Sequence, residues 1–323
     1  MPPLGFAFRP GNCYVKGVAA TASPRRYQTK RDPTLTGVGE APPWNLEAVP
    51  GVEYHGLQDR RMGVLPVSGR RMRWKLAMAR PRHLDRAPIT EALVDLRVQA
   101  PAEFDPARFA DLAESLKQDL PIREELRIIE SGTRIAGKQI SQTIQDRGLH
   151  GYALRTEGPD RIAQFRRDGF TFNKLRPYTS WQEVFSQAWD LWQLYVEKAR
   201  PLIVSRVAVR YINHLRIPYP YSFDEYLSDP PTLSDGAPTQ LTDYFKRIAV
   251  SDPSSNVSAN VIQALEQGPE INTVAFLLDI DVYRMLEMDP RDSALRDIFA
   301  QLQETKNSIF FGAITDQAAE MYE

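Results

Sequence analysis

The same order of patterned segments occurs twice between residue 87 and the C-terminal end of the chain. Residues 87–200 show the periods of a strand, a helix, several strands and a long helix, and residues 202–321 show a strand, a short helix, several strands and a long helix. The joints between first strand and first helix are also alike, at Phe104-Asp105 and at Phe223-Asp224. This order predicts an α+β fold built from a duplicated strand-helix-strands-helix unit.

The duplication also predicts how the two halves assemble. We expect a first α+β repeat over residues 80–201 and a second over residues 202–323, with both repeats in one compact domain. Their sheets would join into one curved, mainly antiparallel sheet that is backed by the two long helices. The alternative is a single α+β domain whose halves match by chance, because the sequence identity between the halves is weak.

The two long helices have recognisable boundary signals. Ser180 is a good N-cap for the first, and Glu183 follows three residues later, as in a capping box. Pro201 ends this helix. In the second half, Asp-Pro at 289–290 predicts a helix through about residue 306, and a further helical piece is expected over 307–321.

The strands are separated by turn signals. Asp168-Gly169 is a strong hairpin turn, and the residues after Pro201 predict a long strand. Residues 126–146 have no clear period, although strand is favoured at 138–145. The remaining predicted strands cover residues 87–98, 151–157, 161–167, 170–175, 243–251, 256–266 and 271–283.

The first 77 residues show neither helical nor strand periodicity, and they are rich in Pro, Gly and Arg. Residues 1–80 carry 13 Lys and Arg against 5 Asp and Glu, whereas residues 81–323 carry 27 against 36. Such a segment buries too little apolar surface to offset the entropy lost on ordering, so we predict a disordered basic leader over residues 1–79. Alternatively the leader is not native, because Met78 directly precedes the first patterned segment and would make a natural start.

Cysteine usage and hydropathy indicate the cellular compartment in which the protein is expected. The only cysteine is Cys13, which excludes a disulfide framework and fits a reducing environment. No window approaches the roughly 18 apolar residues of a membrane span, and the N-terminus lacks the regions of a signal peptide. We therefore expect a cytoplasmic protein.

Several catalytic and cofactor motifs are missing from the sequence. There is no Gly-x-Ser-x-Gly motif, and the four histidines are isolated from one another. Gly132, Gly137 and Lys138 have the spacing of a phosphate-binding loop, but Gln139 stands where that loop needs Ser or Thr. We therefore expect no cofactor and name no catalytic residue.

Basic residues follow one face of the long strand after Pro201. Arg206, Arg210, His214 and Arg216 fall on even positions, opposite the apolar odd positions, and Arg176 follows a neighbouring strand. A sheet that carries arginine and interleaved aromatic residues can bind an acidic protein, or nucleic acid through phosphate contacts and base stacking. The alternative is that these arginines pair with carboxylates of adjacent strands.

Two pairs of carboxylates also share strand faces. Glu91 and Asp95 lie on one face of the first strand, and Asp279 and Asp281 lie on one face of a later strand. Carboxylates from neighbouring strands can hold Mg²⁺ for a metal-dependent nuclease. The alternative is a charged, solvent-exposed face of an antiparallel sheet.

Five segments taken together resemble a known family. They are Ala87-Pro88-Ile89-Thr90-Glu91-Ala92, Arg176-Pro177-Tyr178-Thr179-Ser180-Trp181, Arg210-Tyr211-Ile212-Asn213, Lys306-Asn307-Ser308-Ile309-Phe310 and Ile314-Thr315-Asp316. In this order and spacing they resemble a sporadically distributed family of uncharacterised bacterial proteins, over about residues 80–323. The resemblance implies no activity. The patchy distribution of the family implies a mobile accessory role, as in toxin–antitoxin or phage-defence loci.

These observations predict a non-catalytic binding protein that recognises a macromolecule, with a protein as the favoured partner. Arg176, Arg206 and Arg210 would be the electrostatic anchors. An antitoxin-like or defence-associated role is a special case of this prediction. The alternatives are a metal-dependent nuclease or phosphodiesterase that uses the four carboxylates, and a nucleic-acid-binding protein.

Overall fold

The fold is known from a computed structural model. It describes residues 78–136, 139–158, 160–218, 222–234, 236, 238, 241–267 and 273–323, without the side chains of 133–142 and 267. The predicted leader therefore lies outside the described residues, apart from Met78 and Ala79. Ala79 is buried, and its backbone N–H donates to the Ile314 carbonyl at 2.8 Å.

The described strands form one nine-stranded sheet in which every pair of neighbours is antiparallel. The predicted α+β class with a mainly antiparallel sheet is confirmed. The strand order is β2-β3-β4-β5-β1-β6-β9-β8-β7. The strands are β1 (Ile89–Gln99), β2 (Ile122–Ala136), β3 (Gln139–Arg155), β4 (Arg161–Arg166), β5 (Gly169–Leu175), β6 (Ile203–Pro218), β7 (Phe245–Asp252), β8 (Val257–Gln267) and β9 (Thr273–Met288).

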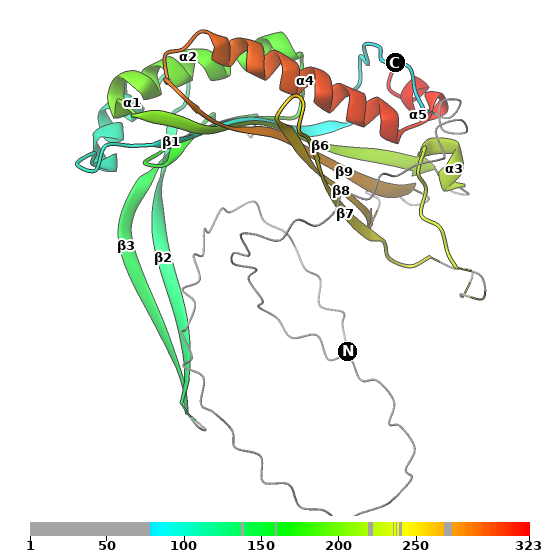
Figure 1. The fold of residues 1–323 in the computed structure, drawn as a ribbon, viewed down its shortest axis with the longest axis horizontal. Coiled ribbons are helices and arrows are strands. Elements are labelled where there is room, and N and C mark those ends of the chain that lie inside the picture. The colour runs from blue at the N-terminus through cyan, green and yellow to red at the C-terminus, as the bar shows by residue number, and fades with distance from the viewer. Residues whose placement is uncertain are drawn as a thin grey trace, which may run out of the picture. The chain divides into compact units, whose positions relative to one another are not determined.

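The long helices α2 and α4 lie along the same side of this sheet (Figure 1). In α2 the Ser180 hydroxyl accepts from the Glu183 N–H at 3.2 Å, so the predicted N-cap is confirmed. The helix ends at Ala199, and its C-cap residue Arg200 has a left-handed backbone conformation. The helices are α1 (Phe109–Ser115), α2 (Trp181–Ala199), α3 (Phe223–Tyr226), α4 (Ala294–Ala313) and α5 (Asp316–Glu320), with a 3-10 turn at Pro106–Arg108.

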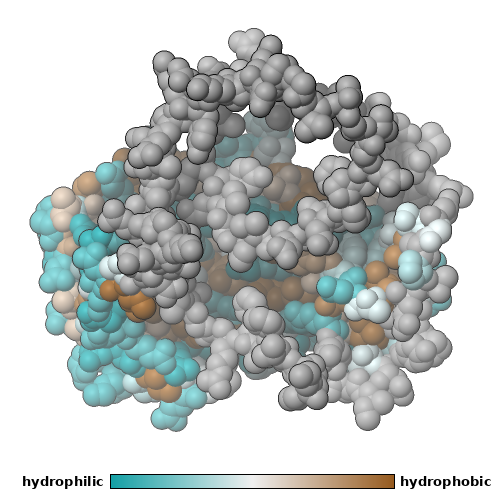
Figure 2. Space-filling view, turned by 90° about the horizontal axis from the view of Figure 1, so that it is seen from below, coloured by the Kyte–Doolittle hydropathy of each residue, from teal (hydrophilic) through white to brown (hydrophobic). Residues whose placement is uncertain are grey.

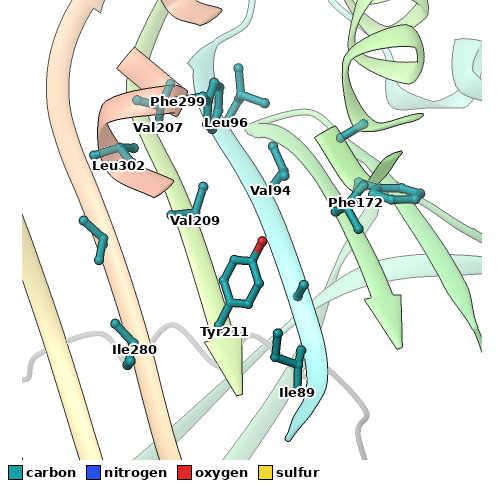
Figure 3. Close-up of a cluster of buried hydrophobic side chains, with 14 of the residues drawn as sticks. Ile89, Val94, Leu96, Phe172, Val207, Val209, Tyr211, Ile280, Phe299 and Leu302 are labelled. Atoms are coloured by element: carbon teal, nitrogen blue, oxygen red, sulfur yellow. The ribbon is translucent and has the colours of Figure 1, made fainter. Parts of the chain in front are cut away.

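The hydrophobic core lies between these helices and the sheet. Alternate residues of the central strands β1 and β6 point toward α2 and α4, and Figure 3 shows Phe299 and Leu302 of α4 next to Val207. Trp192 and Tyr195 of α2 are fully buried and stack at a ring-centroid distance of 5.3 Å. Burial of such rings stabilises a fold by about 2 kcal/mol each or more.

The strand favoured at 138–145 is confirmed as part of β3, and β2 pairs with it as a hairpin. Both boundaries of the last long helix differ from the sequence-based expectation. The predicted helix break near residue 306 is wrong, because α4 continues to Ala313. Its start is also later than predicted, since Asp289 forms a turn by accepting from the Arg291 N–H, and Asp292 accepts from the Ala294 N–H at the true helix start.

Two strand glycines provide a matched stability test. A Cβ added to Gly151 in β3 would lie 2.0 Å from the Phe165 carbonyl oxygen of β4, whereas one added to Gly132 in β2 would meet nothing within 4 Å. We expect Gly151→Ala to lower the free energy of unfolding by about 3 kcal/mol because the strand backbones must separate. Gly132→Ala should leave it within about 0.5 kcal/mol of the wild type. Urea denaturation measures both, and equal effects would contradict the close approach of β3 and β4.

Candidate functional site

The sheet face away from α2 and α4 carries the charged residues that the sequence singled out. In β6, Val207, Val209 and Tyr211 belong to the core, and Arg206 and Arg210 lie on the opposite face. We call this face the open face, because no helix packs on it in the part of the chain that the structure describes (Figure 1). Its central residues are Glu91, Asp95, Arg97, Arg166, Arg206, Arg210, Asp279 and Asp281.

Asp95 is the centre of the charged network on this face. Its carboxylate accepts from Arg97 Nε at 3.1 Å, from Arg166 Nη2 at 3.4 Å and from Arg206 Nη1 at 3.2 Å. The hydroxyl of Thr171 on β5 donates to it at 2.6 Å. Asp95 is 7% exposed and Arg166 only 3%. A buried carboxylate surrounded by three guanidiniums is held in place by charge as well as by hydrogen bonds.

Asp168, in the β4–β5 turn, completes the charge balance around Asp95. It accepts from Arg97 Nη1 at 3.2 Å and from Arg166 Nε at 3.4 Å, and it lies 2.9 Å from His150 Nε2. Burial alone would raise the pKa of the Asp168 carboxyl. The hydrogen bond with His150 and the charges of His150 and the two arginines outweigh burial, so the pKa lies below its usual value.

Two arginine–aspartate ion pairs extend the network across β6 and β9. Arg206 Nη2 donates to both carboxylate oxygens of Asp281, at 3.1 and 3.0 Å, so Arg206 bridges Asp281 and Asp95. Its guanidinium also lies 4.6 Å from the centre of the Tyr283 ring. Arg210 Nε donates to Asp279 Oδ1 at 2.8 Å, and its Nη2 donates to the second oxygen. The hydrogen bond with Asp279 raises the pKa of Arg210 above its usual value.

The other predicted residues are distributed along the sheet. Glu91 accepts from Asn173 Nδ2, and His214 contacts Thr90 Oγ1 at 3.1 Å and Glu266 Oε2 at 3.0 Å. Arg216 and Arg176 are exposed near the Tyr322 hydroxyl, on which both act electrostatically. Arg216 is ten residues from Arg206 on β6, which corresponds to about 33 Å. The structure therefore does not bring the five predicted basic residues together.

The pairing brings together the two residue sets that the sequence analysis treated as alternatives. Each of Asp95, Asp279 and Asp281 has an arginine partner, so the predicted anchors and the predicted metal ligands largely neutralise one another. Within the described residues no group of three or more His, Cys, Asp or Glu side chains is arranged to hold a metal ion. Figure 2 looks onto this side of the molecule, and its coloured part shows hydrophilic and hydrophobic surface interleaved.

A second candidate site lies on the other side of the sheet, beside α4. It is a cavity of about 340 Å³ between the start of α2, the start of β1 and the second half of α4. Lys306 of α4 lines it and is only 6% exposed. The lining residues are Arg82, His83, Leu84, Ala87, Ile89, Tyr178, Thr179, Ser180, Trp181, Gln182, Asn213, Gln303, Lys306, Asn307, Phe310 and Phe311.

The buried lysine has only uncharged partners among the described residues. Its Nζ donates to Asn307 Oδ1 at 2.6 Å and lies 3.9 Å from the centre of the Tyr211 ring. Burial lowers the pKa of Lys306 from 10.5 to about 7. An amine with this pKa is both a partial cation and a partial free base at neutral pH, which is typical of functional sites.

No catalytic or binding motif in the sequence points to this cavity, although most of its lining residues belong to the segments that carry the family resemblance. Ala87, Tyr178, Asn213 and Lys306 come from four different segments of that resemblance, and all line the cavity. From the fifth segment, Asp316 accepts from Arg82 Nη1 at 2.7 Å, and Arg82 is also in the lining. The segments that carry the resemblance therefore converge in space.

The comparisons with known proteins assign no family. No protein-family model, curated protein or solved structure matches the chain. In the part of the chain that the structure describes, every helix is too short or too polar to cross a membrane.

Proposed function

We propose that the protein is a non-catalytic binding protein that recognises a partner protein, in the cytoplasm, through its open face and the β2–β3 arm. We define this arm as residues 127–136 of β2 and 139–150 of β3. The observation that carries the proposal is that β3 pairs with β4 only from Gly151 to Arg155, so the arm consists of two strands alone. It extends to the side of the sheet away from the helices (Figure 1).

A two-stranded ribbon of this length needs a further contact to be well ordered. Isolated hairpins are marginally stable in water, and a long exposed edge can accept an additional strand. Ile129 is 44% exposed and Ile144 is 75% exposed. The register pairs Ile129 with Asp146 and Ser131 with Ile144, which puts both isoleucines on one face of the arm. Exposed isoleucines on a protruding ribbon support contact with an apolar part of a partner.

The charge distribution favours a protein over nucleic acid as the partner. Residues 81–323 carry 27 Lys and Arg against 36 Asp and Glu. On the open face Arg206 and Arg210 are already paired with carboxylates, and on the arm Arg127 pairs with Asp146 at 2.9 Å. Binding of a phosphate backbone depends on unpaired positive charge that displaces counterions. A fixed pattern of both signs is instead suited to selecting a complementary protein surface.

The duplication of the fold is part of the same proposal. In support, β1 pairs with β5 as β6 pairs with β9, and each half continues outward as an antiparallel meander. The first strands of the two halves, β1 and β6, pair with each other at the centre. In each half, the long helix that follows the meander lies on the same side of the sheet (Figure 1). A duplicated unit joined at its first strands produces the wide open face that the partner would use.

Partner capture tests the proposal. We expect the tagged full-length chain to recover one protein in stoichiometric amount from native lysate, and the purified partner to bind again in calorimetry. Ile129→Asp combined with Ile144→Asp should weaken that binding at least tenfold, because two apolar contacts are lost and two charges are placed against the partner. Leu202→Asp is the matched control, since Leu202 is 57% exposed but lies outside the arm. The control should bind as the wild type does.

Two results would contradict the proposal. One is binding of the partner that is equally strong in the arm variant and in the wild type, because the arm would then make no contact. The other is an eluate that contains nucleic acid and no stoichiometric protein. A nucleic-acid stain of the same eluate separates these outcomes.

A further inference from the structure

The cavity beside α4 has the features of a small-molecule site. Its volume of about 340 Å³ is at the lower end of the range for ligand pockets. Trp181, Phe310 and Phe311 supply apolar surface, and Thr179 and Ser180 supply hydroxyl groups. A cavity that combines apolar walls with convergent polar groups can hold a small organic ligand in a fixed orientation.

Two buried polar groups in the cavity lining lack a partner among the described residues: one has no anion beside it, and the other has no hydrogen-bond donor. Lys306 bonds to the Asn307 side chain but to no carboxylate among the described residues, although a buried ammonium normally has an anionic partner. The buried Oε1 atom of Gln303, one turn earlier on α4, has no hydrogen-bond partner. Both residues line the same cavity, so a single ligand can satisfy both.

We propose that this cavity binds a small organic carboxylate. The ligand's carboxylate pairs with the Lys306 ammonium, and its apolar body packs against Trp181, Phe310 and Phe311. A hydroxyl or amide group on the ligand donates to Gln303 Oε1. The inference concerns the helix side of the sheet and is independent of the proposed partner-binding surface.

The other charged groups around the cavity explain the choice of a monoanion. Arg82 is held by Asp316 at 2.7 Å and by Glu323 at 2.5 Å, and His83 lies 3.3 Å from Asp85. Burial raises the pKa of the phenol of Tyr178, so that it is neutral at pH 7. Lys306 is therefore the single cation without an acidic partner in the described lining, and it matches one negative charge. A phosphate dianion would remain partly uncompensated.

Protonation of Lys306 makes the affinity depend on pH in a defined direction. Burial keeps the pKa of the free protein's Lys306 at about 7, so the ammonium form dominates below pH 7. A bound carboxylate stabilises the ammonium and raises that pKa. The affinity is therefore highest and constant below about pH 7, and it falls up to about tenfold for each pH unit above it.

Thermal shift and calorimetry on the full-length protein test the inference with defined probes. The probes are acetate, butyrate, benzoate, phenylacetate and indole-3-acetate at pH 6, each against its neutral amide, with phenyl phosphate as the dianion. We expect an aromatic carboxylate to raise the Tm and to bind at least tenfold more tightly than its amide. Its affinity should decrease at least tenfold between pH 6 and pH 8.5.

Lysine variants show whether Lys306 is responsible. Lys306→Met should remove the preference for the carboxylate and its pH dependence, while Lys198→Met should retain both, because Lys198 pairs with Asp111 on the outside of α2. Three results would overturn the inference. These are no binding by any carboxylate in the set, tighter binding of phenyl phosphate than of phenylacetate, and carboxylate binding that survives unchanged in Lys306→Met.

Discussion

Replacing Asp95 by asparagine should lower the free energy of unfolding by about 3 kcal/mol. The substitution keeps the shape of the side chain but removes the one negative charge that Arg97, Arg166 and Arg206 share. Arg166 is 3% exposed and cannot turn toward water without disrupting the sheet. The asparagine amide also places N–H donors against guanidinium donors, which adds repulsion to the lost attraction.

Urea denaturation at pH 7 measures this loss, and an exposed ion pair provides the control. Asp111 accepts from Lys198 Nζ at 2.7 Å, but its side chain is 78% exposed. Asp111→Asn should therefore leave the free energy of unfolding close to that of the wild type, as is typical of surface ion pairs. If Asp95→Asn costs less than 1 kcal/mol, Asp168 and Asp281 alone compensate the three arginines, and Asp95 is not the centre of the network.

The elements that the sequence predicted best have strong local signals. The Asp168-Gly169 turn places β4 and β5 as neighbours, and the capping residue Ser180 fixes the start of α2. The alternation on β6 correctly separated the core residues from Arg206 and Arg210, because a strand buried on one side sorts its residues with a period of two. These features depend on residues that are close in the chain.

The arm and the strand order depend on contacts that are distant in the chain. Residues 126–146 showed no clear helical or strand periodicity. Their described side chains, at 126–132 and 143–146, are all exposed or half-buried, so none of them marks a face that is buried in a core. The pairing of β1 with both β5 and β6 joins residues more than 70 positions apart. Local propensity and turn chemistry contain no information on such pairings.

Prediction of the ion pairs also depends on the register between neighbouring strands. Sequence placed Arg206 and Asp281 on the surfaces of their strands, but the Cα partner of Arg206 is Met285 on β9 and Arg97 on β1. Its bonds to Asp281 and Asp95 are therefore diagonal contacts, which a long guanidinium side chain can span. An odd or even position on a strand fixes only the face of the sheet on which an arginine lies. The register with the neighbouring strands decides whether that arginine is paired with a carboxylate.

One signal for the cavity was present in the sequence. The buried residues of α4 form an apolar stripe, and Lys306 occupies a position on it between Leu302 and Phe310. A lysine on such a stripe is normally a sign of a long stem that reaches water. Here the predicted break at residue 306 obscured the stripe, because the helix was expected to end at the position where its most unusual residue lies.

Replacing Lys306 by methionine should raise the free energy of unfolding at pH 7, on the order of 4 kcal/mol. Methionine has a similar length and no charge, so it removes the cost of burying an ammonium without leaving a large void. The pKa of Lys306 is about 7 in the folded protein and 10.5 as its usual value. Between these values the unfolded chain binds a proton that the folded chain has released, so the stability of the wild type increases with pH over this range.

Urea denaturation of both proteins from pH 6 to pH 10 separates this effect from the titration of all other groups. The advantage of Lys306→Met should be largest and constant below about pH 7 and should decline by up to about 1.4 kcal/mol for each pH unit above it. A variant that is no more stable than the wild type at pH 7 would show that Lys306 is solvated or paired in the folded state. A gain with this pH dependence would mean that the chain retains a destabilising lysine at the wall of a cavity. Such a residue is expected where binding of an anion offsets the cost of its burial.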